Sequence, residues 1–385
     1  MFDFLLSKEQ IKLRDEVRDL VGWVPRQMIL DMDQDKLQFP KKFLAEAGRR
    51  NLTGCRYPVQ WGGRAMDWVS TCMVMEEVGV LGYIFACVFG VGAELVCDAI
   101  VLHGTNEQKE RYVKPLLAGK IFAAECLTEP RGGSDFFGTA TLAVADGDDY
   151  LLTGQKRFIV DKGPGVTVEY LYGLMGCRGG GAGRVVFREA RVPRANIVGR
   201  LNGALDVFNT MMIPERLGTA AMTIGAARPA LEVAAGYTMR RKAFGQPINQ
   251  FQGVSFQVAQ AATLLDASRA MVYATARAVD AGVPMNRVRR LVSQTKKFVT
   301  ESCQQVARHA MQVMGGIGYT NVFPVERIVR DLQLASIWTG TNEVMSMITA
   351  HEWYDEYARL KAAGTRRDHE MDAQCATDEE EKVYE

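Results

Sequence analysis

The sequence predicts an α+β fold, mostly α, with an N-terminal helical domain, a small middle β domain and a C-terminal four-helix bundle. Three observations predict this class. Apolar residues recur at helical spacing over 1–122, glycine and β-branched residues dominate 123–200, and long segments rich in Ala, Met, Gln and Arg fill 201–362. We therefore expect three domains with these bounds, followed by a polar, disordered tail over 363–385.

Composition narrows the possible functions before any motif is considered. The 385 residues carry 46 Lys+Arg against 45 Asp+Glu, a formal net charge of +1, and 48% of them are hydrophobic. A near-neutral chain has no global attraction for nucleic acid or for an anionic membrane, and this apolar fraction excludes wholesale disorder. Charges such as Glu94 and Asp98 interrupt the apolar runs, so we expect no membrane insertion.

The cysteines and histidines indicate a chain that works in a reducing compartment. The eight cysteines are scattered without a CxxC pair, and there are only four histidines. We therefore expect neither disulfides nor a metal site. The N-terminus has no basic region followed by an apolar stretch, so no secretory signal is expected and the predicted location is cytoplasmic.

The individual elements follow from residue spacing and turn residues. In the N-terminal part, Ser7 and Gln10 are typical of a capping box. Apolar spacing there predicts further helices over 69–80, 85–102 and 106–118. In the middle part, short strands are expected between turns at 139–145, 150–153, 157–160, 166–170 and 184–187. In the C-terminal part, helices of bundle length are expected over 206–240, 251–280, 284–314 and 336–361.

Three segments combine residue types that suit ligand binding. Residues 123–135 (AAECLTEPRGGSD) join helix to strand, and their small residues let the backbone approach a flat ligand, although an ordinary Pro-Gly turn gives the same pattern. Within 240–252, Arg241 could either satisfy helix C-terminal carbonyls or hold a phosphate. Residues 312–343 contain two glycine-bearing steps that helix caps also explain. Neither GxGxxG nor a Walker-type phosphate loop occurs.

As an ordered set, these segments resemble the acyl-CoA dehydrogenase flavoprotein family. LTEPRGGSD, RRKAFGQPINQFQ and QVMGGIGYTNVFPVERIVRD carry the resemblance, which covers the chain from Leu6 to Leu360. It implies a helical domain, a middle β domain and a C-terminal four-helix bundle, assembled as a homotetramer that binds FAD between the β domain and the bundle. The implied reaction is α,β-dehydrogenation of an acyl-CoA thioester, with electrons passed to an electron-transferring flavoprotein.

The resemblance also implies roles for individual positions. The implied cofactor contacts are Thr128, Ser134, Phe158, Val160, Arg241, Phe244, Gln252, Gln312, Gly315, Gly316 and Thr341. Those from Arg241 to Gly316 would reach FAD from a neighbouring subunit, which links cofactor binding to assembly. The implied substrate contacts are Ser134, Arg216 and Gly340. Val160 stands where a flavin-contacting threonine is common, and a valine cannot make that hydrogen bond.

The catalytic base is the main departure from the family pattern. Most members carry a glutamate immediately before the Gly-Thr step of the last segment, where this chain has Thr339. A neutral hydroxyl cannot act as a carboxylate base, although the backbone N–H of Thr339 could still bind the thioester oxygen. Glu215 matches the base of the subset that includes isovaleryl-CoA and long-chain acyl-CoA dehydrogenases. The alternative reading of Glu215 is a first-turn glutamate after Pro214, stabilised by the helix dipole.

Two further departures concern the β domain and the acyl pocket. The family has more chain between segments like 155–160 and 165–187, so about two strands and their loop are expected to be absent, either because this domain is shorter or because the sequence omits a segment. Gly90, Gly92 and Ala93 fall near the segment that lines the acyl pocket. Small residues there leave room for a branched, cyclic or aromatic acyl group, and helix packing explains them equally well.

Three alternatives remain open at the level of sequence. A chain of this fold could perform a different elimination or dehydrogenate at an unusual position. It could be a non-catalytic subunit paired with a catalytic homologue, or a plain helical interaction protein. A bound flavin that is bleached by an acyl-CoA separates the leading hypothesis from all three.

Overall fold

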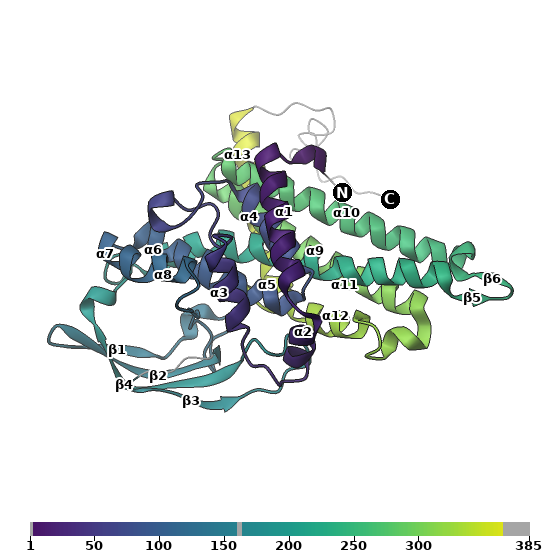
Figure 1. Ribbon diagram of the computed structural model, residues 1–385. Helices are drawn as coiled ribbons and strands as arrows, with labels where there is room; N and C mark the ends of the chain where they lie inside the picture. The colour runs from purple at the N-terminus through teal and green to yellow at the C-terminus, as the bar shows by residue number, and fades with distance from the viewer. Residues whose placement is uncertain (1–2, 160–163, 365–385) are drawn as a thin grey trace.

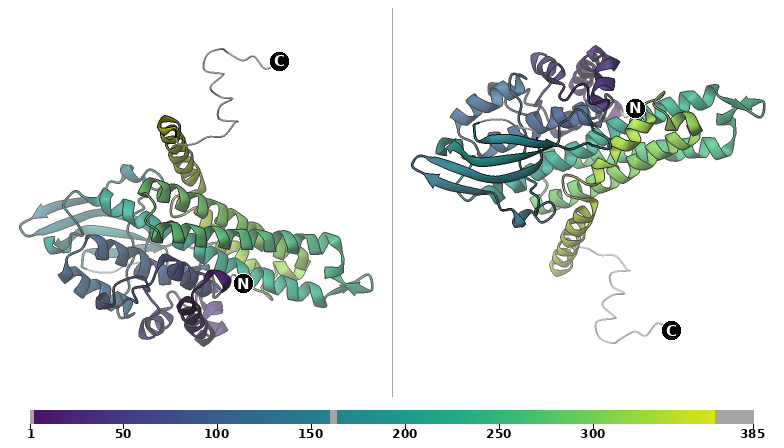
Figure 2. Two further views of the ribbon diagram at one scale, coloured as in Figure 1. Left: turned by 90° about the horizontal axis from the view of Figure 1, so that it is seen from above. Right: turned by 90° about the horizontal axis from the view of Figure 1, so that it is seen from below.

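A computed structural model describes residues 3–159 and 164–364 (Figure 1). Val160 and residues 365–385 of the expected tail lie outside the described residues. The described chain is mostly helical with a small antiparallel sheet in the middle, so the predicted fold class is confirmed. Figure 2 shows the sheet at one end of an elongated molecule and a short hairpin, β5 (Lys242–Ala243) and β6 (Gln246–Pro247), at the other.

The N-terminal part is a set of short helices. They are α1 (Lys8–Trp23), α2 (Arg26–Asp33), α3 (Lys41–Arg49), α4 (Trp68–Gly79), α5 (Tyr83–Gly90), α6 (Cys97–His103), α7 (Asn106–Gln108) and α8 (Lys114–Leu117). The predicted capping box precedes α1: the Gln10 N–H donates to Ser7 Oγ at 3.2 Å, and the Ser7 N–H donates to Gln10 Oε1 at 2.9 Å. π-Helical turns at Val91–Val96 and Lys109–Val113 interrupt the helices predicted at 85–102 and 106–118.

One step in the reasoning about membranes is wrong: Glu94 and Asp98 do not interrupt the apolar run in which they lie. Within the described residues, Tyr83–His103 is long and apolar enough to cross a bilayer, because its two carboxylates are too few to break the apolar run. In the fold, 67% of its most apolar window is buried inside the protein. The two carboxylates, Glu94 and Asp98, both form ion pairs with Arg56. The segment is therefore a core helix.

The middle sheet contains four antiparallel strands in the order β1-β2-β4-β3. They are β1 (Leu142–Asp146), β2 (Asp149–Ile159), β3 (Val166–Leu171) and β4 (Gly183–Pro193). β1 and β2 form a tight hairpin in which Asp146 pairs with Asp149. The strands expected at 150–153 and 157–160 are one strand, β2, because Gly154 adopts a φ of 155° at a bulge that the pairing tolerates. β1 is exposed along its whole length.

Long helices dominate the C-terminal part. They are α9 (Ala204–Arg240), α10 (Gln252–Asp280), α11 (Met285–Met314) and α13 (Asn342–Ala363), with the short α12 (Val325–Leu332) between the last two. α13 begins later than predicted, because Leu334–Ser336 is a 3-10 turn and the Thr341 hydroxyl caps the helix by accepting the Val344 N–H at 3.3 Å. α9 begins at Ala204, so Pro214 and Glu215 lie about three turns inside it. The alternative of a first-turn glutamate after an N1 proline is therefore wrong.

One hydrophobic core joins the N-terminal helices to the bundle. α4 and α9 approach so closely that a Cβ on Gly225 would lie 2.0 Å from the Glu76 carbonyl oxygen, which only glycine avoids. Two carboxylates of α4 form buried ion pairs with neighbouring helices: Arg269 Nη2 lies 2.8 Å from the Glu76 carboxylate, and Arg228 Nη2 lies 2.9 Å from the Glu77 carboxylate. These contacts fix α9, through Arg228, and α10, through Arg269, relative to the N-terminal helices.

Candidate active site

Glu215 is a half-buried carboxylate on α9. Among the described residues it has no hydrogen bond and no ion pair. Burial is the largest cause that raises the pKa of Glu215, which reaches about 8, and the nearby Glu125 carboxylate adds to the rise. The cations Arg216 and Lys296 oppose it. The side chain is therefore a carboxyl group near its titration point with its oxygens uncommitted.

The two cations beside Glu215 are themselves buried and directed elsewhere. Arg216 Nη1 donates to Ser293 Oγ at 3.2 Å, and its Nε has no partner among the described residues. Burial lowers the pKa of Arg216 to about 10. Lys296, on α11, is completely buried, and burial lowers its pKa to about 8. Its Nζ donates to the Gly340 carbonyl oxygen at 2.8 Å and to Asn342 Oδ1 at 2.9 Å. Lys296 therefore links α11 to the loop before α13.

That loop, residues 337–341, has an unusual backbone. Thr339 adopts a φ of 57°, which is rare for a β-branched residue, and Gly340 adopts a φ of 82°. Trp338 Nε1 donates to the Tyr83 hydroxyl at 2.7 Å and so attaches the loop to α5. The Thr339 hydroxyl is buried without a partner in the described part of the chain. The loop is therefore held from two helices in a strained conformation.

The motif around Thr128 is anchored to the sheet. The Arg157 N–H donates to the Thr128 carbonyl oxygen at 2.8 Å. Next to it, the buried Glu129 accepts hydrogen bonds from the Ala140 N–H at 2.6 Å and from Lys156 Nζ at 2.8 Å. Burial alone would raise the pKa of Glu129, but these hydrogen bonds lower it to about 2. Glu129 is therefore a structural carboxylate that shapes the Thr128 segment.

Two other predicted flavin contacts lie near the same sheet. Ser134 is exposed, and Phe158 is 55% exposed with a φ of 66°. The Phe158 ring lies 5.3 Å from the ring of Tyr172. Phe158 thus has a left-handed backbone conformation and an exposed ring, so the ring is available to a flat ligand. The contacts described within one chain do not explain this conformation.

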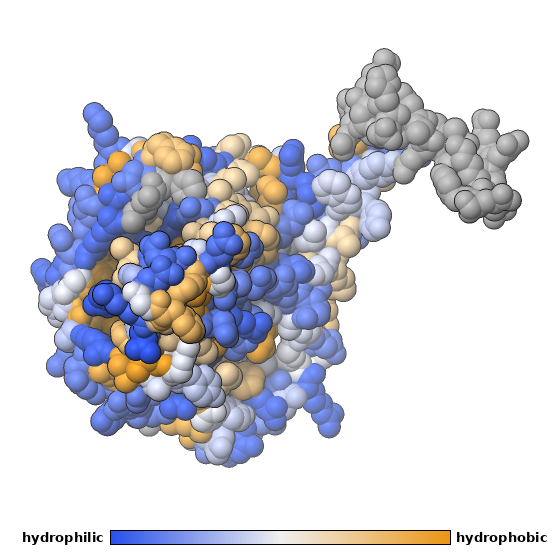
Figure 3. Space-filling view, turned by 90° about the vertical axis from the view of Figure 1, so that its right-hand side faces the viewer, coloured by the Kyte–Doolittle hydropathy of each residue, from blue (hydrophilic) through white to orange (hydrophobic). Residues whose placement is uncertain are grey.

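The remaining predicted cofactor contacts gather at the opposite end of the bundle. Arg241, Phe244, Gln252, Gln312, Gly315 and Gly316 are all exposed near the β5–β6 hairpin, at the ends of α9 and α11 and the start of α10. Glu215 lies 25 residues before Arg240 on α9, which at 1.5 Å per residue is about 38 Å. Figure 3 faces this end and shows apolar surface among the polar side chains. One chain does not bring the two groups together.

A small, partly open cavity adjoins the segment that leads to Thr128. Its lining residues are Phe39, Leu44, Thr53, Val88, Phe89, Gly92, Ala93, Leu116, Gly119, Ile121, Phe122 and Ala123. Gly92 and Ala93 are thus at a cavity, as the sequence suggested. Gly90 is not in the lining, and a Cβ there would lie 2.6 Å from the end of the Met75 side chain.

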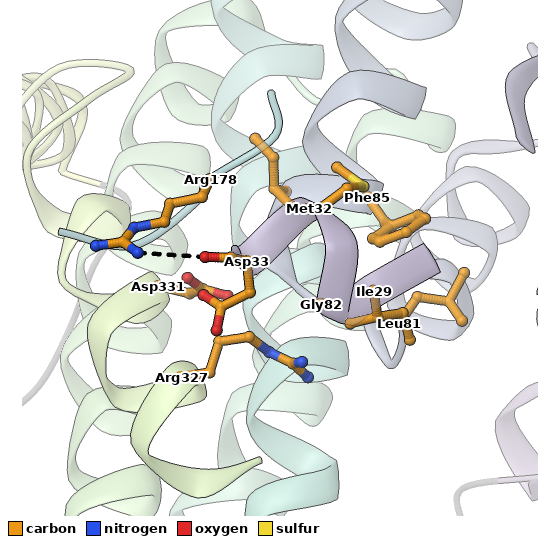
Figure 4. A pocket seen from close by; sticks show the side chains of 10 residues that line it. Ile29, Met32, Asp33, Leu81, Gly82, Phe85, Arg178, Arg327 and Asp331 are labelled. Carbon is orange, nitrogen blue, oxygen red and sulfur yellow. Dashed lines mark hydrogen bonds between the residues drawn. The ribbon is translucent and has the colours of Figure 1, made fainter. Parts of the chain in front are cut away.

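A second small cavity contains none of the predicted site residues. Figure 4 shows Asp33, Asp331, Arg178 and Arg327 on one side of it and apolar side chains on the other. Arg178 Nη1 donates to the Asp33 carbonyl oxygen at 3.2 Å, and Asp331 Oδ1 accepts the Cys177 N–H at 2.6 Å. The polar groups mostly bind one another, which indicates a structural junction between α2, α12 and the loop before β4.

Sequence reasoning missed two charged residues of the site. Glu125 was within a motif that drew notice for its small residues, yet a carboxylate in a run of alanines is itself a signal. Lys296 lies within a Val-, Gln- and Arg-rich helix, where its burial leaves no local mark on the sequence. Among the described residues no group of three or more His, Cys, Asp or Glu side chains could hold a metal ion.

The side chains present fit a flavin dinucleotide. Hydroxyls at Thr128, Ser134 and Thr341 suit a polar ring edge, and the exposed Arg241 has no ion pair among the described residues. The buried Thr339 hydroxyl and the Arg157 Nε also lack partners in that part of the chain. Unsatisfied donors next to exposed aromatic surface are what a large polar aromatic ligand would use.

The length of the alignment with one relative bears on the β domain, which the sequence predicts to be short. The chain is 30% identical over 380 residues to the probable acyl-CoA dehydrogenase YngJ of Bacillus subtilis, in an alignment that covers 91% of this chain and 99% of the relative. Because 91% of 385 residues is about 350, some 30 of the 380 aligned positions face gaps in this chain. Two strands of usual length and a loop fit within such a gap. Where the missing positions fall stays a prediction.

Other comparisons agree on the family. Models of the N-terminal and C-terminal domains of acyl-CoA dehydrogenases match residues 7–120 and 203–353. The chain is 31% identical over 375 residues to the caffeyl-CoA reductase-Etf complex subunit CarC of Acetobacterium woodii, covering 89% of this chain and 97% of the relative. The solved structure of butyryl-CoA dehydrogenase from Megasphaera elsdenii matches with a TM-score of 0.85 at 26% identity, covering 91% and 99%. The chain therefore belongs to the acyl-CoA dehydrogenase family of flavin-dependent oxidoreductases, which act on the CH–CH bond of acyl-CoA thioesters.

Proposed function

We propose that the chain is an FAD-dependent acyl-CoA dehydrogenase in which Glu215 is the catalytic base. The observation that carries this proposal is the state of Glu215: a half-buried carboxylate whose oxygens have no partner among the described residues. A raised pKa and a free lone pair suit a group that takes a proton from a weak carbon acid. Thr339 occupies the more usual position of the base and cannot replace it, because its hydroxyl is neutral.

The loop before α13 supplies the electrophilic part of the proposed mechanism. The backbone N–H of Thr339 binds the thioester oxygen and stabilises the negative charge that develops there when the α-proton leaves. The left-handed conformation of Thr339 and its anchoring through Lys296 support this role, since strain that surrounding contacts maintain is typical of functional loops. When bound, FAD accepts the hydride from the β-carbon.

Cofactor binding in this proposal requires a second copy of the chain. The exposed Arg241 holds the pyrophosphate of an FAD whose flavin lies near Thr128, Ser134, Phe158 and Thr341 of a neighbouring subunit. The distance of about 38 Å along α9 supports this division, because no single FAD site spans it within one chain. Phe244, 96% exposed, also favours an assembly that covers it. We propose a homotetramer as that assembly.

We further propose an aromatic, cyclic or branched acyl group as substrate and an electron-transferring flavoprotein as electron acceptor. Gly92 and Ala93 in the mostly apolar lining of the cavity support a bulky acyl group, because neither has a large side chain that would fill the space. The relative whose name couples caffeyl-CoA to an Etf complex supports both parts. Six buried cysteines of the described residues (Cys55, Cys72, Cys87, Cys97, Cys177 and Cys303) are free thiols, which supports a cytoplasmic location.

The decisive experiment is anaerobic reduction of the bound flavin by a panel of acyl-CoA thioesters. The Glu215→Gln variant should still bind FAD, but an acyl-CoA should reduce this flavin about 10²–10⁴-fold more slowly, because general-base catalysis contributes a rate factor of this size. Glu232→Gln is the matched control, since Glu232 is on the same helix with a side chain 68% exposed. Near-native flavin reduction by Glu215→Gln would exclude Glu215 as the base, and no bleaching by any thioester would sink the proposed reaction.

A further inference from the structure

A cluster of three phenylalanine rings at the surface has no role in the proposed mechanism. Phe136 and Phe137 begin a 3-10 turn just after Ser134, and the Phe136 ring stacks on the ring of Phe208 from α9. These two ring centroids lie 4.2 Å apart, with an angle of 13° between the planes. The Phe137 ring lies 5.3 Å from the Phe136 ring in an edge-to-face arrangement, and Phe137 is 80% exposed. The cluster therefore presents an aromatic surface to solvent.

The loop that carries Phe136 and Phe137 is closed at its base. The Glu129 carboxylate accepts hydrogen bonds from the Ala140 N–H at 2.6 Å and from the Thr141 N–H at 3.2 Å. The Glu129 N–H donates to the Gly132 carbonyl oxygen at 2.9 Å. Residues 129–141 therefore form a compact surface loop with its ends held together, a type of loop that is frequently functional. The same loop carries Ser134, a substrate contact that the family resemblance implies.

The position of Phe208 on α9 relates the cluster to the candidate base. Phe208 and Glu215 are seven residues apart, so they lie on one face of the helix, about 10 Å apart along its axis. Helical spacing is kept across Pro214, because Arg216 Nη2 donates to Met212 Sδ at 3.3 Å. A ligand that lies along this face of α9 can therefore reach from Glu215 to the aromatic cluster.

A different face of α9 contacts α6. Nε2 of His103 lies 2.9 Å from the Thr210 hydroxyl oxygen. Thr210 is two residues after Phe208, which places it about 200° around the helix. The face with Phe208 and Glu215 instead meets the loop 129–141 at its outer end, through the Phe136 ring. The loop and α9 thus come together two helical turns from the candidate base.

We propose that this cluster binds the adenine of acyl-CoA, with Phe137 stacked on the base and Phe136 and Phe208 supporting the Phe137 ring. This inference rests on the proposed function and assigns the nucleotide end of its substrate. Adenine is the only aromatic group of CoA, and a long flexible arm separates it from the thioester. With the thioester at Glu215, the base lies away from the half-buried site and toward the surface, where the cluster is. Stacking on an aromatic side chain is a common way for proteins to bind a base.

Turnover of two thioesters with the same acyl group, acyl-CoA and acyl-pantetheine, isolates the contribution of the nucleotide. Phe137→Ala should raise KM for acyl-CoA about 10-fold with kcat unchanged, because stacking on one base contributes about this much and is the same in ground state and transition state. KM for acyl-pantetheine, which lacks the nucleotide, should not change. An unchanged KM for acyl-CoA, or an equal rise with both thioesters, overturns the proposal.

Two further variants separate the aromatic ring from the fold. Phe137→Tyr keeps the ring and should retain the wild-type KM for acyl-CoA, which a merely structural role of Phe137 would not require. Leu142→Ala is the matched control, because Leu142 is 62% exposed on β1, just beyond the loop, and has no aromatic ring. It should also retain the wild-type KM. If KM stays unchanged in Phe137→Ala and only reduction of an electron-transferring flavoprotein slows, the cluster contacts that partner and the proposal is overturned.

A binding measurement needs no turnover and distinguishes CoA from FAD, which carries the same base. Free CoA should bind the substrate-free holoenzyme in calorimetry, and Phe137→Ala should weaken this binding about 10-fold. Equal affinities overturn the proposal. The variant should keep the wild-type flavin content; loss of FAD would assign the cluster to the cofactor and overturn the proposal as well. If CoA binds as expected but no thioester bleaches the flavin, the adenine site stands and the proposed reaction fails.

Discussion

Replacing Lys296 with methionine tests whether α11 positions the loop that carries Thr339 and Gly340. The buried Lys296 Nζ donates to the Gly340 carbonyl oxygen at 2.8 Å and to Asn342 Oδ1 at 2.9 Å. Methionine keeps most of the side-chain volume but removes the charge and both donors. The variant therefore releases the loop while the surrounding packing remains.

The structure predicts a small effect on stability and a large effect on rate. Two buried acceptors that lose a donor cost about 1–3 kcal/mol each, although Asn342 Oδ1 retains the Thr300 hydroxyl at 3.3 Å. Burial lowers the pKa of Lys296 from 10.5 to about 8, so removing its charge should raise the free energy of unfolding by about 3 kcal/mol. The terms nearly cancel, so the free energy of unfolding should change by less than about 2 kcal/mol. A loop displaced by about 1 Å should slow flavin reduction about 10²-fold.

The assay pairs urea unfolding with stopped-flow flavin bleaching. Lys297→Met is the control, because Lys297 is the next residue, its side chain is 38% exposed, and its Nζ lies 2.9 Å from Glu301 one helical turn away. Such a surface pair contributes about 0.3–0.5 kcal/mol. If Lys296→Met bleaches its flavin as fast as Lys297→Met, the loop is not positioned from α11 and the reasoning is refuted.

Three further predictions address the loop, the sheet and the cofactor. Gly340 has a φ of 82° and a Cβ there would lie 2.7 Å from Met345 Cε, so Gly340→Ala should lower the free energy of unfolding by about 1–3 kcal/mol. Its control, Gly236→Ala, adds a methyl group in open space on α9 and should raise the free energy of unfolding by about 0.5–1 kcal/mol. Equal urea midpoints for the two variants would contradict this. Glu129→Gln should lower the free energy of unfolding by about 3 kcal/mol at pH 7. Because the pKa of Glu129 in the folded protein is about 2, the difference between wild type and variant should disappear in acid unfolding between pH 4.5 and 2; a difference that does not change with pH would contradict this. Arg241→Ala should lower the flavin-to-protein ratio on purification, and full flavin content would remove Arg241 from the cofactor site.

Much of the fold could be read from local pattern. The capping box at Ser7 and the hairpin at Asp146 depend on contacts a few residues apart, which the sequence states directly. Errors arose where a local signal had a second meaning. Pro214 favours the first turn of a helix, yet it lies inside α9, because the apolar residues before it extend the helix back to Ala204. Gly154 favours a break between strands, yet it forms a bulge within β2.

The candidate site divides in the same way. The ordered motifs predict the family, the bound flavin and the candidate base at Glu215 instead of at position 339. These signals depend only on which residue type stands at a given position. The neighbours of Glu215 were not predictable, since Glu125, Lys296 and Glu215 are far apart in the chain and meet only when α9, α11 and the segment before the sheet pack together. Burial then determines how their charges act, because the cost of removing a charge from water depends on the whole fold around it.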